Sequence, residues 1–232
     1  MTGQKSSDKK YRRMKDCSMG KVDKKKQQKR TSLLDTAFNL FTSRGIHNTS
    51  ISDIVENAGV AKGTFYLYFK DKYDIRNKLI AHKAAEVFRI ADEALQKEDF
   101  SSFGENAVYE EKVIFLADNI INRFAADKTL LRFISKKLDW GMFKNVFTGT
   151  GNDGVDCYDI YDAVFQGEHD RYENPEIMVY LIIELVSSTC YNAILAGEPA
   201  PIEELKPYIF RTVRQIMQSH LIRKNVINKE KK

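Results

Sequence analysis

The feature that most constrains this sequence is a pair of short apolar-patterned segments joined at Ala58-Gly59-Val60. The first segment follows Thr49-Ser50, and either hydroxyl can cap a helix by accepting a main-chain N–H. The glycine accepts backbone angles that other residues resist, so the chain can turn sharply there. The second segment, Lys62 to Phe69, follows after only a few residues. Two short helices so closely joined predict a helix-turn-helix over about residues 50–69.

The side chains of this helix pair divide between a small core and an outward face. The residues able to form the core are Phe38, Phe41, Ile54, Val55, Val60, Phe65 and Phe69. The outward residues of the second helix are then Lys62, Gly63, Thr64, Tyr66, Leu67 and Tyr68. A cation, a hydroxyl and two phenols, beside a glycine that permits close approach, suit a helix lying in the major groove of DNA.

Helical periodicity runs through the rest of the chain, and nothing reads as a repeated strand pattern. Twelve Gly and four Pro in 232 residues also favour helices over a turn-rich β architecture. We expect a helix from about Gln27 to Gly45 and a long one, capped by Asp71, over 71–97. The further predicted helices cover residues 105–125, 128–138, 142–147, 153–166, 174–196 and 201–222. The prediction is an all-α protein of two domains.

The net charge of +5 is unevenly distributed. Residues 1–30 contain twelve Lys and Arg against three Asp, so the remainder of the chain is mildly acidic. Such a basic block is usually a solvated, disordered tail, and beside a DNA-binding domain it also neutralises phosphate. We therefore predict a basic, disordered arm over residues 1–26 and a charged tail over 223–232. A membrane-surface role for the arm is weaker because it has almost no apolar face.

The run from Arg44 to Ile75 resembles the N-terminal domain of the TetR family of transcriptional regulators. The matching positions are Thr49-Ser50, Ile54-Val55, Ala58-Gly59-Val60, Gly63-Thr64-Phe65-Tyr66, Tyr68-Phe69, Lys72 and Ile75. The resemblance covers about residues 27–87, which would form the helix-turn-helix DNA-binding domain. It implies that residues 88–222 form a helical effector-binding and dimerisation domain, although these residues resemble the family only in architecture.

The same resemblance assigns roles on DNA. The predicted contacts are Arg30, Thr49, Ser52, Lys62, Gly63, Thr64, Tyr66, Tyr68 and Lys72. Thr49 and Ser52 would meet phosphate, helped by the N–H groups at the start of a helix. Lys62, Thr64 and Tyr66 would face base edges, with Gly63 allowing close approach. Tyr68 and Lys72 would grip the phosphate backbone.

The last two predicted helices, 174–196 and 201–222, are the expected homodimer interface. The first is apolar almost all round, and the second carries one apolar stripe. Two such pairs would form a four-helix bundle about a two-fold axis, whereas in the alternative they complete a monomeric core. Residues 177–196 are also long enough to span a bilayer, but a central Glu184 costs roughly 2.5–3.5 kcal/mol on insertion scales. We therefore expect a buried helix in a cytoplasmic protein without a membrane partner.

The middle region is rich in aromatic residues, a composition that usually reflects core packing. The resemblance implies an inducer cavity there, for a small apolar or amphipathic effector. The residues predicted to line this cavity are Tyr109, Trp140, Phe143, Glu184 and Tyr191. Glu184 is expected to be buried, so it should meet an arginine, a polar network or a cationic ligand.

Other chemistries find little support. Gly149 to Gly154 fits G-x-G-x-x-G, but that dinucleotide motif needs a preceding strand, and we interpret the segment as a loop. The three cysteines and four histidines are too scattered to predict a disulfide, metal or cofactor site. No nucleophile and base are paired in the pattern, so we expect no enzyme.

The predicted function is a repressor released from a pseudopalindromic operator by an effector. The alternative is a TetR-like DNA-binding protein controlled by a protein partner.

Overall fold

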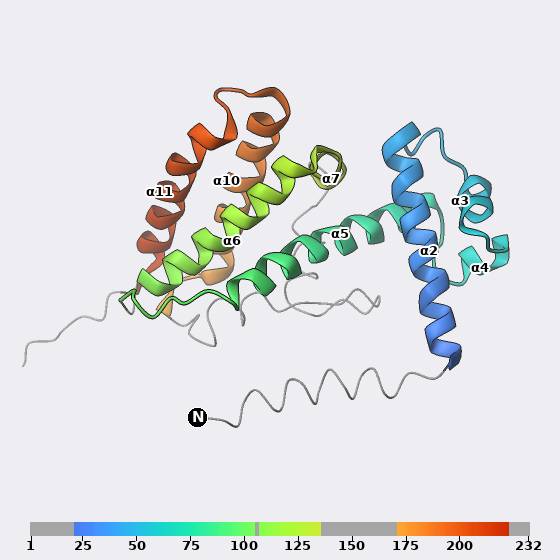
Figure 1. Ribbon diagram of the computed structural model, residues 1–232, viewed down its shortest axis with the longest axis horizontal. Coiled ribbons are helices and arrows are strands. Elements are labelled where there is room, and N and C mark those ends of the chain that lie inside the picture. The colour runs from blue at the N-terminus through green and yellow to red at the C-terminus, as the bar shows by residue number, and fades with distance from the viewer. Residues whose placement is uncertain (1–20, 105–106, 136–170, 223–232) are drawn as a thin grey trace, which may run out of the picture. The chain divides into compact units, whose positions relative to one another are not determined.

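The computed structural model describes residues 21–104, 107–135 and 171–222 (Figure 1). Its helices are α2 (Lys21–Arg44), α3 (Ile51–Ala58), α4 (Lys62–Tyr66), α5 (Lys72–Leu95), α6 (Ala107–Ala126), α7 (Lys128–Ile134), α10 (Pro175–Ala196) and α11 (Ile202–His220). Within the described residues there is no strand, and the only β pairing is an isolated bridge between Tyr172 and Leu221. The predicted all-α fold class is confirmed. The helices predicted at 142–147 and 153–166, and the loop at 149–154, lie outside the described residues.

The chain divides into two compact units, Met1–Leu79 and Ile80–Lys232, here called the N-terminal and C-terminal units. The division falls earlier than the predicted domain limit at residue 87, and it falls inside α5. That helix therefore contributes residues to both units.

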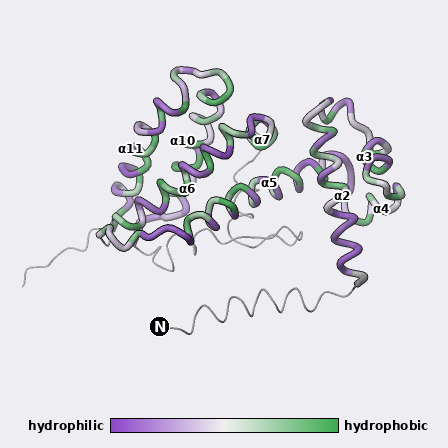
Figure 2. Tube along the Cα trace, viewed as in Figure 1, coloured by the Kyte–Doolittle hydropathy of each residue, from purple (hydrophilic) through white to green (hydrophobic). Residues whose placement is uncertain are grey.

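The first described helix begins earlier than the sequence pattern suggested. α2 starts at Lys21, so the last part of the predicted basic arm is helical. Figure 2 shows this first stretch of α2 as strongly hydrophilic. Lysine and glutamine have high helix propensity, which lets a helix extend past the point where its apolar pattern ends.

In the N-terminal unit α2 packs on α3, and α3 packs on α4. The buried apolar residues in it are Leu33, Leu34, Ala37, Leu40, Phe41, Ile54, Val55, Phe65, Phe69, Ile75 and Leu79. Of the predicted core, Phe41, Ile54, Val55, Phe65 and Phe69 are buried, whereas Phe38 and Val60 are half-buried. Gly59 ends α3 with φ of 66°, the left-handed turn for which a glycine was expected.

In the C-terminal unit, α10 packs against α6, α7 and α11, and α6 also packs against α11. Salt bridges join α11 to α6. The Lys206 ammonium lies 3.1 Å from Asp118, and Arg214 lies 2.7 Å from Glu111. The start of α10 is joined to the end of α11, because the Ile222 amide donates to the Arg171 carbonyl at 2.9 Å. These links fix the two C-terminal helices side by side.

Candidate nucleic-acid interface

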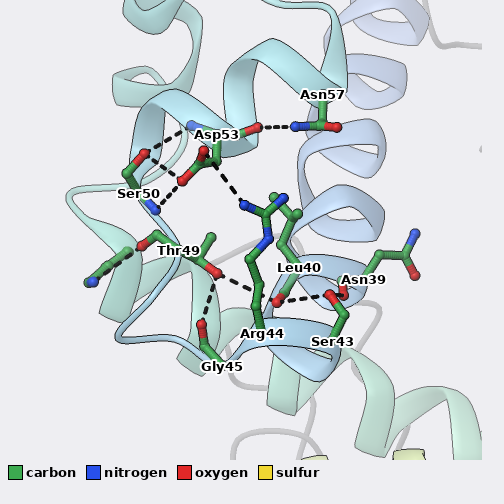
Figure 3. A network of polar contacts seen from close by, with 10 residues as sticks. Asn39, Leu40, Ser43, Arg44, Gly45, Thr49, Ser50, Asp53 and Asn57 are labelled. Carbon is green, nitrogen blue, oxygen red and sulfur yellow. Dashed lines mark hydrogen bonds and ion pairs between the residues drawn. The ribbon is translucent and has the colours of Figure 1, made fainter.

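The start of α3 is built by a reciprocal pair of side-chain bonds. The Ser50 hydroxyl accepts from the Asp53 amide at 3.0 Å, and the Asp53 carboxylate accepts from the Ser50 amide at 2.7 Å. This capping box satisfies two amides that a helix start leaves without partners. The bond from the Ser50 amide, with that from its hydroxyl, holds the pKa of Asp53 below its usual value, and Arg44 lies 3.8 Å away. Figure 3 shows this network.

Thr49, just before this cap, does not face outward. Its side chain is 1% exposed, and its hydroxyl donates to the Gly45 carbonyl at 2.8 Å, as Figure 3 shows. Its amide donates to the Ile46 carbonyl at 3.3 Å. The Thr49 hydroxyl therefore has a role inside the α2–α3 loop. Its predicted phosphate contact would require the bond to Gly45 to break.

Lys72, the first residue of α5, reaches back to the same loop. Its ammonium donates to the carbonyls of Ile46, His47 and Thr49, at 2.9, 3.3 and 3.2 Å. An ammonium has three hydrogens, and in this arrangement each has a main-chain acceptor. The predicted contact of Lys72 with phosphate would require these hydrogen bonds to break.

Tyr68 is also engaged within the unit. Its hydroxyl donates to the main-chain carbonyl of Lys26, in α2, at 3.1 Å. Its ring is half-buried beside Phe69, with centroids 6.2 Å apart. A phosphate contact by this hydroxyl would compete with the bond to α2.

The outward face of α4 carries most of the predicted base contacts. Lys62 and Gly63 are exposed, and the Tyr66 and Leu67 side chains are 53% and 79% exposed. A Cβ on Gly63 would meet nothing within 4 Å, so the surface there is open. Phe65 and Phe69, buried beneath with ring centroids 5.5 Å apart, fix this face to the core. The structure thus presents a cation, a phenol and an aliphatic side chain on one small exposed helix.

The remaining predicted contacts differ in exposure. Ser52, in the first turn of α3, is exposed, and Thr64 and Arg30 are half-buried. The first-turn amides of Ile51 and Ser52 take no part in the capping box, so the start of α3 still offers main-chain donors to an anion.

Residues 33–79 match the model of the family described as "Bacterial regulatory proteins, tetR family". This match spans the capping box, the turn at Gly59, the whole of α4 and the beginning of α5. The chain therefore carries a DNA-binding domain of the TetR family.

Two curated relatives of this chain illustrate the likeness. The Fatty acid metabolism regulator protein of Bacillus subtilis is 31% identical over 107 residues, which is 46% of this chain and 51% of that protein. The regulator AcrR of Shigella flexneri is 37% identical over 59 residues, 25% of this chain and 27% of its own length. The chain spans about half the length, or less, of the curated relatives it matches.

Solved structures extend the likeness of fold to most of the chain. The fatty acid degradation regulator FadR from Bacillus halodurans superposes with a TM-score of 0.54 at 19% identity, covering 80% of this chain and 94% of that one. A TetR-family protein from Syntrophomonas wolfei gives 0.54 at 20% identity, covering 87% and 99%. The chain therefore shares the helical fold of these proteins.

The predicted effector-site residues fall at separate places in the C-terminal unit. Tyr109, on α6, is buried, and its ring lies 5.6 Å from the Lys112 ammonium and 5.2 Å from the Arg171 guanidinium. Tyr191, on α10, is half-buried. Trp140 and Phe143 lie outside the described residues. The structure gives Tyr109 two cationic neighbours, which the sequence did not indicate.

The expectation of a buried Glu184 is wrong. α10 buries one face, formed by Met178, Ile182, Val186, Cys190, Ala193 and Ile194, and Glu184 lies exposed on another. The apolar composition all round the helix suggested complete burial. Among the residues that the structure describes, however, α10 packs only against α6, α7 and α11.

Sequence reasoning also missed Arg44 and Asp53, which set the electrostatics at the start of α3. A signal for Asp53 was available, because an acidic residue three positions after Ser50 is the spacing of a capping box. Arg44 lies in another helix, and no local pattern pairs it with Asp53.

Proposed function

We propose that the chain is a homodimeric repressor that binds a pseudopalindromic operator through α3 and α4 and is released by a small apolar or amphipathic effector. The proposed DNA contacts are Arg30, Ser52, Lys62, Gly63, Thr64 and Tyr66. Lys62, Thr64 and Tyr66 would read base edges in the major groove. The start of α3 and the basic arm would contribute phosphate contacts.

The observation that carries this proposal is the exposed face of α4 on a rigid support. Tyr66 is 53% exposed and Leu67 79%, although both follow directly on the fully buried Phe65. Adjacent aromatic and aliphatic side chains exposed on one anchored helix are typical of a surface that meets a partner. The positive charge of Lys62 and the open surface at Gly63 indicate that this partner is a nucleic acid.

Dimerisation is supported by the uncovered face of α10. Ile177, Tyr180 and Leu181 are 53%, 38% and 41% exposed, and on α11 Tyr208 is 59% exposed. Only 28% of the most apolar stretch of α10 is buried. The helix is also long and apolar enough to span a membrane. A second copy explains the face better, because Glu184, Ser187 and Ser188 share it and polar groups are tolerated at the rim of a protein interface. A two-fold pair would place two DNA-binding units roughly 34–36 Å apart, one turn of DNA.

An effector acts only if it binds one state of the protein better than the other. α5 belongs to both units, so it is the element along which a change in the C-terminal unit would reach α3 and α4. Because one relative is named a fatty acid metabolism regulator, long-chain fatty acids are the first effector class to test. The cations beside Tyr109 suit an acidic head group.

The deciding experiment is selection of bound sequences from random duplex DNA by the purified protein at two salt concentrations. An inverted repeat recovered at both concentrations supports a dimeric regulator that reads the groove. If no sequence is enriched and binding disappears as salt rises, phosphate attraction alone accounts for binding and the proposal fails.

A second measurement distinguishes regulation by a protein partner from release by a small effector. Long-chain fatty acids are titrated into the complex of the protein with its selected operator, and release is followed by fluorescence anisotropy. Release at micromolar concentrations supports the small-molecule mechanism. An operator complex that no tested amphipath affects would favour a protein partner.

A further inference from the structure

Lys72 has an unusual set of partners for a residue expected on the DNA backbone. Its ammonium is within 3.3 Å of three carbonyl oxygens, those of Ile46, His47 and Thr49. All three belong to the loop between α2 and α3. The loop thus forms a main-chain cradle for one ammonium.

The third of these bonds bears directly on α3. The Thr49 carbonyl and the Ser50 amide belong to the same peptide group. Lys72 binds its oxygen at 3.2 Å, and the Asp53 carboxylate accepts from its N–H at 2.7 Å. A cation at the oxygen and an anion at the N–H both match the peptide dipole, so the orientation of this group is fixed from two sides. Ser50 is the N-cap of α3, and the orientation of the group sets where that helix begins.

We propose that Lys72 is a positioning residue for DNA binding and not a ligand of phosphate. It holds the Thr49–Ser50 peptide group, and with it the first turn of α3, in a fixed relation to the first turn of α5. This inference rests on the function proposed above, because positioning α3 has a consequence only if α3 meets DNA.

The arrangement also gives α5 a direct connection to α3. Lys72 is the first residue of α5, and Asp71 caps that helix by accepting from the amides of Tyr73 and Asp74 at 2.7 and 2.8 Å. A displacement of the first turn of α5 therefore moves the ammonium, and the ammonium moves the start of α3. The α2–α3 loop, α3 and the first turn of α5 respond as one body.

The test compares Lys72→Met with Lys70→Met, because Lys70 is an exposed lysine two positions away that is not among the proposed DNA contacts. Hydrogen exchange is measured on the free full-length proteins. Losing the Lys72 bonds should speed exchange of the hydrogen-bonded amides at the start of α3, those of Ser50, Asp53 and Ile54, roughly tenfold in Lys72→Met. Lys70→Met should leave these amides unchanged.

Operator affinity is then measured against salt, at a temperature where circular dichroism shows each variant folded. Lys72→Met should bind roughly tenfold more weakly, with the wild-type slope of log affinity against log salt. A purely structural residue would leave the affinity of the folded protein unchanged. If the loop amides are unaffected and the slope becomes shallower by about 0.9, Lys72 is a phosphate ligand and the inference is overturned.

Lys72→Arg decides the question if the methionine variant does not fold. Arginine keeps the charge and binds phosphate well, so a phosphate ligand predicts unchanged affinity. A planar guanidinium cannot direct three hydrogens from one atom toward three carbonyls, so a positioning role predicts a loss. The exchange measurement needs no DNA, so it tests the cradle even if the wild type selects no operator and the proposed function fails.

Discussion

Lys72 and Asp53 hold opposite ends of a single peptide group, the one that joins Thr49 to Ser50. The ammonium lies 3.2 Å from its oxygen and the carboxylate 2.7 Å from its nitrogen. The two residues come from different helices, and together they decide how the chain enters α3. The side chains that hold this turn are consequently distinct from those that α4 presents outward, such as Lys62 and Tyr66.

Thr49→Val should destabilise the N-terminal unit without changing the phosphate contacts. Valine has nearly the shape of threonine but leaves the Gly45 carbonyl without the hydroxyl that now donates to it at 2.8 Å. Leaving a buried acceptor unsatisfied costs about 1–3 kcal/mol. Urea unfolding should show this loss, while the salt slope of operator binding stays at the wild-type value. A shallower slope with unchanged stability would instead place Thr49 on phosphate.

Asp53→Asn should lower stability in a pH-dependent way. The pKa of Asp53 is held below its usual value by the hydrogen bonds from Ser50 and by Arg44. Its charged form therefore stabilises the folded chain above the pKa of the unfolded state, and this contribution is lost as pH falls through the lower, folded-state pKa. Melting temperatures of the wild type and the variant should differ at pH 7 and converge in strong acid. A constant difference across that range would show that the carboxylate charge contributes nothing.

Tyr66→Ala should weaken operator binding while leaving the fold intact. The side chain is 53% exposed and sits on the outward face of α4, so stability should change by less than about 0.5 kcal/mol. Loss of a base contact should cost about 1–3 kcal/mol in binding. The control is Tyr73→Ala, since Tyr73 is 44% exposed in the same unit but is not among the proposed contacts. Equal affinity losses in both variants would remove Tyr66 from the reading surface.

Leu181→Glu should convert the proposed dimer to monomer. Leu181 is 41% exposed on the uncovered face of α10, where a second copy would bury the new carboxylate without a partner. Sedimentation equilibrium measures the association. Ile90→Glu is the matched control, because Ile90 is 38% exposed on α5 and should remain in contact with water. If Leu181→Glu and the wild type have the same mass in solution, the interface lies elsewhere.

Much of the local structure could be predicted because helix ends are specified by nearby residues. Gly59 takes the left-handed conformation at the end of α3, Asp71 caps α5, and Pro175 begins α10, each as the sequence indicated. The limits of the helices were less predictable. α2 begins at Lys21, before its apolar pattern starts, because charged residues with high helix propensity continue the helix without packing.

Of the candidate DNA interface, only the exposed face of α4 could be predicted from the sequence. By itself, the sequence determined that the chain forms helices, that a tight turn at Gly59 joins two short ones, and that α4 carries polar and aromatic residues beside Gly63. These properties depend on caps, turns and periodicity, all of which act over a few residues.

Tertiary structure alone decided which side chains are exposed and which are held by hydrogen bonds within the chain. Lys72 bonds to carbonyls more than twenty positions earlier in the chain, and Thr49 is enclosed by the end of α2. Glu184 is exposed because the described helices that pack on α10 cover another side of it. Burial and long-range hydrogen bonds depend on which elements meet, and no local pattern of residues specifies that.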